Sequence, residues 1–119
     1  MSAGTAGLAQ RKCVPCRKGT APLTRREAED YLRLIRGWQL DGAAKSIGQE
    51  FVMKDFLSAV QLMDQIARVA ESEDHHPDLH VTAYRRLRVE MSTHSIGGLS
   101  ENDFILAAKI DQLPKNLKV

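Results

Sequence analysis

Histidine is the residue type that most plainly suggests chemistry in this sequence. Three of the four histidines lie in the segment SEDHHPDLH (72–80), together with three carboxylates and one proline. An unperturbed histidine titrates near pH ~6.5, so it can donate and accept protons at neutral pH. The segment therefore indicates an acid–base site, while a metal site and a protein-binding turn are the alternatives.

Carboxylates are the usual partners of catalytic imidazoles, because they fix the tautomer and stabilise the charged ring. Glu71, Glu73 and Asp74 are each close enough in sequence to serve. A carboxylate-rich helix end followed by His75 is also typical of a solvated C-terminus, where an imidazolium interacts favourably with the helix dipole. On the pattern alone, catalysis and a plain helix end both remain open.

A metal site finds less support in the spacing of possible ligands. Cys13 and Cys16 form a lone CVPC motif, and no second pair of ligands follows at the distance typical of zinc fingers. His76 and His80 are four residues apart, which would suit a helix, but Pro77 makes this segment extended. We expect no metal, and we expect the two thiols to lie in a flexible extension.

Bulk composition excludes several classes of function. The 119 residues suffice for one domain, and a formal charge of +2 is too small to indicate a nucleic-acid or anionic-membrane partner. Six aromatic residues make a base-stacking surface improbable. The sequence contains no apolar run of ~18 residues and no secretory signal, so we expect a cytoplasmic protein.

The hydrophobic pattern predicts one domain behind a flexible N-terminal extension. The extension covers residues 1–21 and includes CVPC, and the domain covers residues 22–119. Caps and periodicity predict helices that begin at Thr24, Asp55 and Ser100, and Pro77 ends the second helix near residue 74 or 75. Extended segments are expected at residues 38–40, 47–53, 79–84 and 86–94.

These elements predict a two-layer α+β domain in the order helix-β-β-α-β-β-α. Alternation in RLRVEMSTH indicates a sheet with one face covered by helices, and it places His94 at a strand end on the open face. The long helix has an apolar stripe for the core, made of Phe56, Ala59, Val60, Met63, Ile66, Ala67 and Ala70. Asp103 has the spacing of a capping-box partner for Ser100, so a purely structural role also explains it.

One long segment, EDHHPDLHVTAYRRLRVEMSTHSIGGLSENDF, resembles the signature of the pterin-4a-carbinolamine dehydratases. Animal members of that family also serve as dimerisation cofactors of a homeodomain transcription factor. The residues that carry the resemblance are Glu71, His75-His76-Pro77, Tyr84, His94 and Asp103. The likeness covers roughly residues 22–112. Six residues separate Pro77 from Tyr84 where some members have five, so Tyr84 is left out of the expected site.

The resemblance implies a cofactor-free dehydratase that acts by histidine acid–base catalysis. Its substrate would be a 4a-hydroxytetrahydropterin released by an aromatic amino acid hydroxylase, and its product the quinonoid dihydropterin. The family pattern implies that His75, His76 and His94 are catalytic. It also implies that Glu71, Pro77 and Asp103 contact or orient the substrate. A four-stranded antiparallel sheet with helices on one face, assembled into homodimers or homotetramers, is the implied architecture.

A non-catalytic binding module on the same fold is the alternative function. Such a module would act as a dimerisation partner of another protein, or as a pterin carrier without turnover. Its first candidate surface is the exposed sheet face with Arg86, Arg88 and Glu90. The sequence leaves open the natural pterin, the division of acid and base roles, and the role of the thiol pair.

Overall fold

A four-stranded antiparallel sheet is the base on which the site is built. In the computed structural model, which describes residues 4–17 and 19–119, its strands lie in the order β1-β2-β4-β3. They are β1 (Gln39–Leu40), β2 (Ile47–Val52), β3 (Asp78–Thr82) and β4 (Arg86–Met91). The two longest strands pair in the centre, with Ile47 opposite Met91 and Val52 opposite Arg86.

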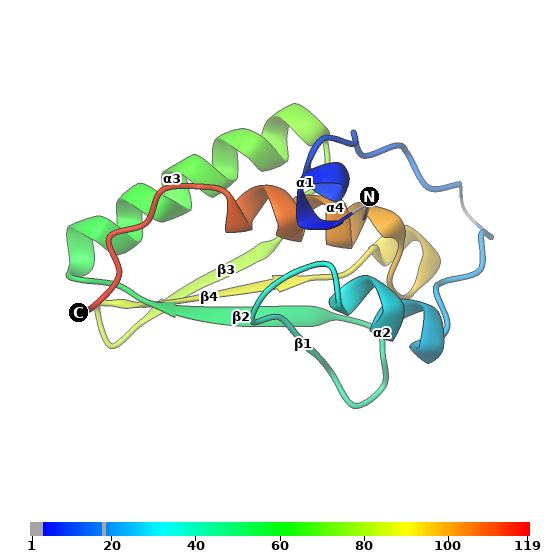
Figure 1. Cartoon of the computed structure of the whole chain (residues 1–119), viewed down its shortest axis with the longest axis horizontal. Helices are drawn as coiled ribbons and strands as arrows, with labels where there is room; N and C mark the ends of the chain where they lie inside the picture. The colour runs from blue at the N-terminus through cyan, green and yellow to red at the C-terminus, as the bar shows by residue number, and fades with distance from the viewer. Residues whose placement is uncertain (1–3, 18) are drawn as a thin grey trace.

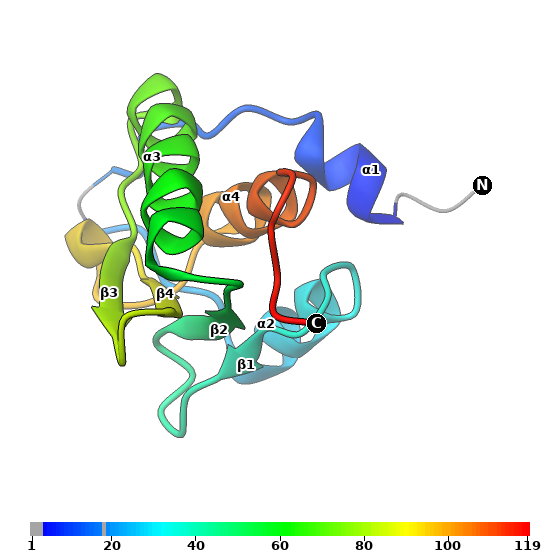
Figure 2. The ribbon, with the colours of Figure 1, turned by 90° about the vertical axis from the view of Figure 1, so that its left-hand side faces the viewer.

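The described residues form four α-helices, of which the last three were predicted and the first was not. They are α1 (Gly4–Ala9), α2 (Arg25–Leu32), α3 (Phe56–Glu73) and α4 (Glu101–Asp111), with a 3-10 turn, η1 (His94–Ile96), between β4 and α4. Figures 1 and 2 show α3 and α4 over one face of the sheet, with α2 beside β1. The predicted α+β fold is confirmed.

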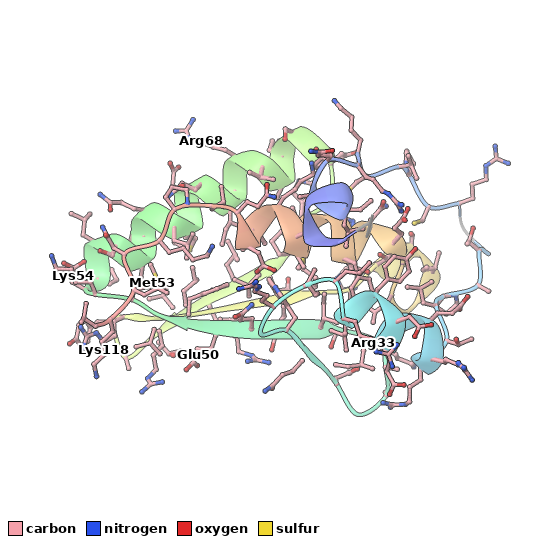
Figure 3. The ribbon with its side chains drawn as sticks, viewed as in Figure 1. Arg33, Glu50, Met53, Lys54, Arg68 and Lys118 are labelled. Atoms are coloured by element: carbon pink, nitrogen blue, oxygen red, sulfur yellow. The ribbon has the colours of Figure 1, made fainter. Side chains whose placement is uncertain are left out.

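Side chains alternate between the two faces of β4, as the sequence predicts. Leu87, Val89 and Met91 are buried beneath the helices. On the opposite face the charged residues pair with one another: Arg86 Nη1 lies 2.8 Å from Glu50 Oε2, and Arg88 Nε lies 2.8 Å from Glu90 Oε2. Figure 3 shows Glu50 projecting away from α3.

The helix caps read from the sequence are present, while the apolar stripe of α3 is only partly confirmed. Capping boxes join Thr24 to Glu27 and Ser100 to Asp103. Ala59, Ile66 and Ala70 are buried as expected, together with Ser58 and Leu62. The expectation is wrong for Phe56 and Ala67: Phe56, at the start of the helix, remains 56% exposed, and Ala67 is exposed too.

All four strands are shorter than predicted, and in β3 and β4 the difference affects the site. β3 ends at Thr82, because Ala83 and Tyr84 adopt positive φ angles of 46° and 52° in the turn to β4. Tyr84 is 58% exposed at that turn. β4 ends at Met91, so the expectation of His94 at a strand end is wrong: it is the first residue of η1.

Both ends of the described chain lie against the domain. At the C-terminal end, Leu117 forms a β-bridge with Met53, and Lys118 N–H donates to Val52 (2.9 Å), beside the labelled Met53 and Lys118 of Figure 3. At the N-terminal end, α1 packs on α4, and Leu8 is 2% exposed in the core. Leu8 belongs to the segment for which the sequence predicts a flexible extension. None of the helices in the described chain is long and apolar enough to cross a membrane.

Candidate active site

His75 lies directly after the C-terminal end of α3. Asp74 ends the helix in a left-handed conformation with φ 52°. The N–H groups of Asp74 and His75 both turn back to Ala70 O, at 3.2 Å for His75. This pattern of returning bonds is the common way to stop a helix, and it fixes where the next residue leaves. The helix end therefore sets the position of the His75 backbone.

Asp103 approaches His75 from the first turn of α4. Its carboxylate is fully buried, and Oδ2 accepts two hydrogen bonds, from Ser100 N–H (3.0 Å) and from the Thr93 hydroxyl (2.8 Å). Thr93 Oγ1 also lies 2.8 Å from Ser100 Oγ. The capping role expected for Asp103 is therefore confirmed, and it occupies only one of the two carboxylate oxygens.

The other oxygen of Asp103 binds His75. His75 Nε2 lies 2.7 Å from Asp103 Oδ1, and the imidazole is only 11% exposed. Because a carboxylate accepts hydrogen bonds, this contact places the proton on Nε2 and leaves Nδ1 unprotonated in the neutral ring. No buried side-chain nitrogen or oxygen of the described residues lacks a partner, so the unpaired Nδ1 reaches solvent. His75 thus has one nitrogen held by Asp103 and one nitrogen without a hydrogen-bond partner among the described residues.

His76 is held more loosely, by a carboxylate on its own helix. Its Nε2 lies 3.0 Å from Glu71 Oε1, with side chains 57% and 82% exposed. Pro77 is half-buried and leads into β3. The two adjacent histidines therefore have different partners and different access to water.

His94 enters the same region through its neighbour Thr93. η1 begins at His94, directly after the residue whose hydroxyl binds Asp103. The imidazole is exposed and has no hydrogen-bond partner among the residues that the structure describes. Asp103 and Thr93 thus connect His75 to the residue directly before His94.

His80 lies outside this group of histidines, and the described residues include no cluster suited to a metal ion. His80 Nε2 is 3.6 Å from Glu90 Oε1 on the outer face of the sheet. Within residues 4–17 and 19–119, no three His, Cys, Asp or Glu side chains come together as metal ligands would. Tyr84 lies at the exposed hairpin turn.

Contacts of the CVPC segment were missed by sequence reasoning. Cys13 N–H donates to Glu73 Oε1 (2.7 Å), and Cys13 Sγ lies 3.6 Å from Asn102 O. Burial, reinforced by the Glu73 carboxylate, raises the pKa of Cys13 to about 12. A redox-active thiol has a lowered pKa, so Cys13 has the opposite character.

Together these contacts describe a buried carboxylate–imidazole pair, with His76 next to His75 in the chain and His94 directly after the Thr93 that binds Asp103. The family model for pterin 4 alpha carbinolamine dehydratase matches residues 21–113. The chain belongs to the pterin-4a-carbinolamine dehydratase family. The family predicted from the histidine signature is thereby confirmed, and its named members are hydro-lyases.

Relatives of this dehydratase-family chain match most of its length. A relative from Nitrosomonas eutropha, whose name places it in the same family, is 50% identical over 107 residues, which cover 89% of this chain and 92% of that protein. Pterin-4-alpha-carbinolamine dehydratase 2, mitochondrial, of Arabidopsis thaliana is 42% identical over 91% of this chain and 59% of its own length. The Nitrosomonas match is longer than residues 21–119, so it includes part of the extension.

Two solved structures resemble this chain, one as a family relative and one in fold alone. A transcriptional coactivator/pterin dehydratase from Brucella melitensis superposes with a TM-score of 0.70 at 39% identity, covering 75% of this chain and 94% of that one. A pterin dehydratase-like RuBisCO assembly factor reaches a TM-score of 0.54 at 16% identity, which shows a shared fold alone.

Proposed function

We propose that this chain removes water from a 4a-hydroxytetrahydropterin and releases the quinonoid dihydropterin. The observation that carries the proposal is the buried pair of His75 and Asp103, with 2.7 Å between Nε2 and Oδ1 and with Nδ1 not bonded to any described residue. Family membership supplies the substrate class. The pair supplies a group that can exchange a proton with that substrate.

Two proton transfers accompany this dehydration. The bond between C4a and its hydroxyl oxygen breaks as a proton reaches that oxygen, and water leaves. A proton departs from the neighbouring ring nitrogen, and its electron pair forms the new double bond to C4a. The numbers of protons given and taken are equal, so imidazoles alone suffice and the proposed steps use no cofactor.

We assign the proton transfers to His75, through Nδ1, and to His94. The Asp103 carboxylate keeps the proton of His75 on Nε2 and stabilises the imidazolium whenever Nδ1 is protonated. His76, oriented by Glu71, and the half-buried Pro77 would contact the pterin. Asp103 acts on the ring of His75 in this scheme, because Thr93, Ser100 and His75 already occupy its oxygens.

Replacing single histidines tests this assignment. We expect His75→Ala and His94→Ala to lower kcat for a synthetic 4a-hydroxytetrahydropterin by about 10²–10⁴, the usual effect of a lost acid–base group. His80→Ala is the matched control, since this third ring lies on the outer sheet face. Absorbance at the quinonoid product's band follows the reaction. Full activity in both variants would refute the assignment.

The binding module is the competing function, and the same assay separates the two. Tight pterin binding by the wild type without turnover would support a carrier or a dimerisation partner. The outer sheet face gives that reading little support, because Arg86 and Arg88 are already paired with Glu50 and Glu90. Homodimers or homotetramers, a functional link to a hydroxylase and a cytoplasmic location remain predictions.

A further inference from the structure

The N-terminal extension bridges the two elements that carry the His75–Asp103 pair. From residue 13 it reaches the end of α3, where Cys13 N–H donates to Glu73 Oε1 (2.7 Å). From residue 14 it reaches the start of α4, where Val14 N–H donates to Asn102 Oδ1 (3.0 Å). Figures 1 and 2 show this segment passing from α1 over α4 and past the end of α3.

Asn102 binds the extension as one peptide group binds another. Its side chain is 5% exposed; Oδ1 accepts from Val14 N–H, and Nδ2 donates to Val14 O at 2.5 Å. The Cys13 thiol donates to the backbone carbonyl of Asn102. Losing these partners would leave a buried amide unsatisfied, which is destabilising. The extension is therefore built into the start of α4.

Glu73 is where the extension, α3 and α4 meet. Its side chain is 10% exposed; Oε1 accepts from Cys13 N–H, and Oε2 lies 3.7 Å from Lys109 Nζ. Lys109 Nζ donates in turn to Ala9 O (2.7 Å). Burial alone would raise the pKa of Glu73, but the Cys13 N–H and the Lys109 charge outweigh it and leave that pKa lowered. Glu73 is thus held as a carboxylate by both neighbours.

These contacts lie next to the proposed reacting groups in the chain. Glu73 precedes His75 by two residues, and Asn102 directly precedes Asp103. We propose that residues 8–16, which we name the clamp, hold the His75–Asp103 hydrogen bond in place, with Cys13 and Asn102 as positioning residues. The kinetic part of this proposal rests on the proposed function. Positioning matters because a displacement of ~1 Å can cost ~10²-fold in rate.

Breaking the clamp at Asn102 is the direct test. We expect Asn102→Ala to lower kcat about tenfold with little change in KM, because the pterin contacts remain while the imidazole loses its orientation. Val14→Ala is the matched control, since Val14 uses only its backbone and its side chain is 63% exposed.

A milder pair of variants covers the case in which Asn102→Ala fails to fold. Cys13→Ala removes the thiol donor, whereas Cys13→Ser restores a donor to the Asn102 carbonyl. We expect a lower kcat in the first variant and rescue in the second. Equal rates in the two variants would overturn the proposal.

A readout independent of turnover is the ring of His75, seen by NMR in protein labelled with ¹⁵N-histidine. We expect a single Nε2–H tautomer in the wild type and Val14→Ala, and mixed tautomers in Asn102→Ala and Cys13→Ala. A fall in kcat with an unchanged tautomer would mean a merely structural role and would overturn the clamp. If the wild type does not turn over but the tautomer responds, the proposed function falls and the clamp stands.

Discussion

His75 and His76 each have one carboxylate partner, but the two pairs differ in their exposure to water. His75 and Asp103 are 11% and 0% exposed, and their contact closes 28 residues of chain. His76 and Glu71 are mostly solvated, and an exposed ion pair of this kind contributes little. A charge-assisted hydrogen bond shielded from water is worth about 1.5–3 kcal/mol. Asp103 is therefore the carboxylate that decides how an imidazole of this site is held.

Amide substitutions should show that Asp103 affects kcat more than Glu71 does. The first variant is Asp103→Asn. The amide still accepts from Ser100 N–H, but it has no charge to stabilise an imidazolium, so we expect kcat to fall about a hundredfold or more. Glu71→Gln, at the exposed pair, should change kcat by less than about threefold. Steady-state kinetics with a thermal melt of each variant measure both effects. Equal losses in the two variants would contradict the ranking.

The sequence could indicate which residues do chemistry, but not all of their partners. Glu71 and His76 are five residues apart, and Ser100 and Asp103 are three residues apart. Both contacts are local, so the sequence can predict them. The contact of Thr93 with Asp103 and the contacts of residues 13 and 14 join segments that only folding brings together. No periodicity or cap encodes them.

At the scale of elements, the end of α3 is the feature that fixes the site. Pro77 correctly predicted that the helix stops before His76, but not how. Asp74 stops it with a positive φ of 52°, a conformation that costs an ordinary L-residue roughly 1–2 kcal/mol and glycine nothing. His75 then leaves the helix toward α4. Asp74, the residue that directs His75 away from the helix, therefore has a small backbone strain.

Glycine at this position should relieve that strain. We expect Asp74→Gly to raise the free energy of unfolding by about 0.5–1 kcal/mol, part of the gain being lost to the greater freedom of the unfolded chain. Asp74→Ala is the matched control: it removes the same exposed carboxylate without gaining freedom, so it should be the least stable of the three. Urea unfolding gives the order. Alanine equal to glycine would show that charge, and not backbone strain, sets the stability here.

At the scale of the whole molecule, the extension is part of the folded structure around the site. α1 contributes Leu8 and Ala9 to the core, and the clamp then joins α3 to α4. Composition alone gave the opposite impression, because small residues, Gly and Pro are typical of loose segments. What holds the segment is a set of buried partners supplied by Glu73, Asn102 and Lys109, from elements more than fifty residues away.

The thiol of Cys13 reports whether that docking exists in solution. Burial and the nearby Glu73 carboxylate raise its pKa from 9.0 to about 12, which lowers the thiolate fraction at pH 8 about a thousandfold, and the thiolate is the species that alkylates. Iodoacetamide should therefore modify Cys13 far more slowly in the folded protein than in urea, as mass spectrometry of the Cys13 peptide would show.

Glu73→Gln removes one cause of the raised pKa of Cys13 and should speed alkylation of the folded protein. Glu71→Gln, on the solvated side of the helix, should leave that alkylation rate unchanged. Native alkylation at the unfolded rate would mean that the clamp is not formed, because a solvated thiol has neither the burial nor the fixed carboxylate that keep this one protonated.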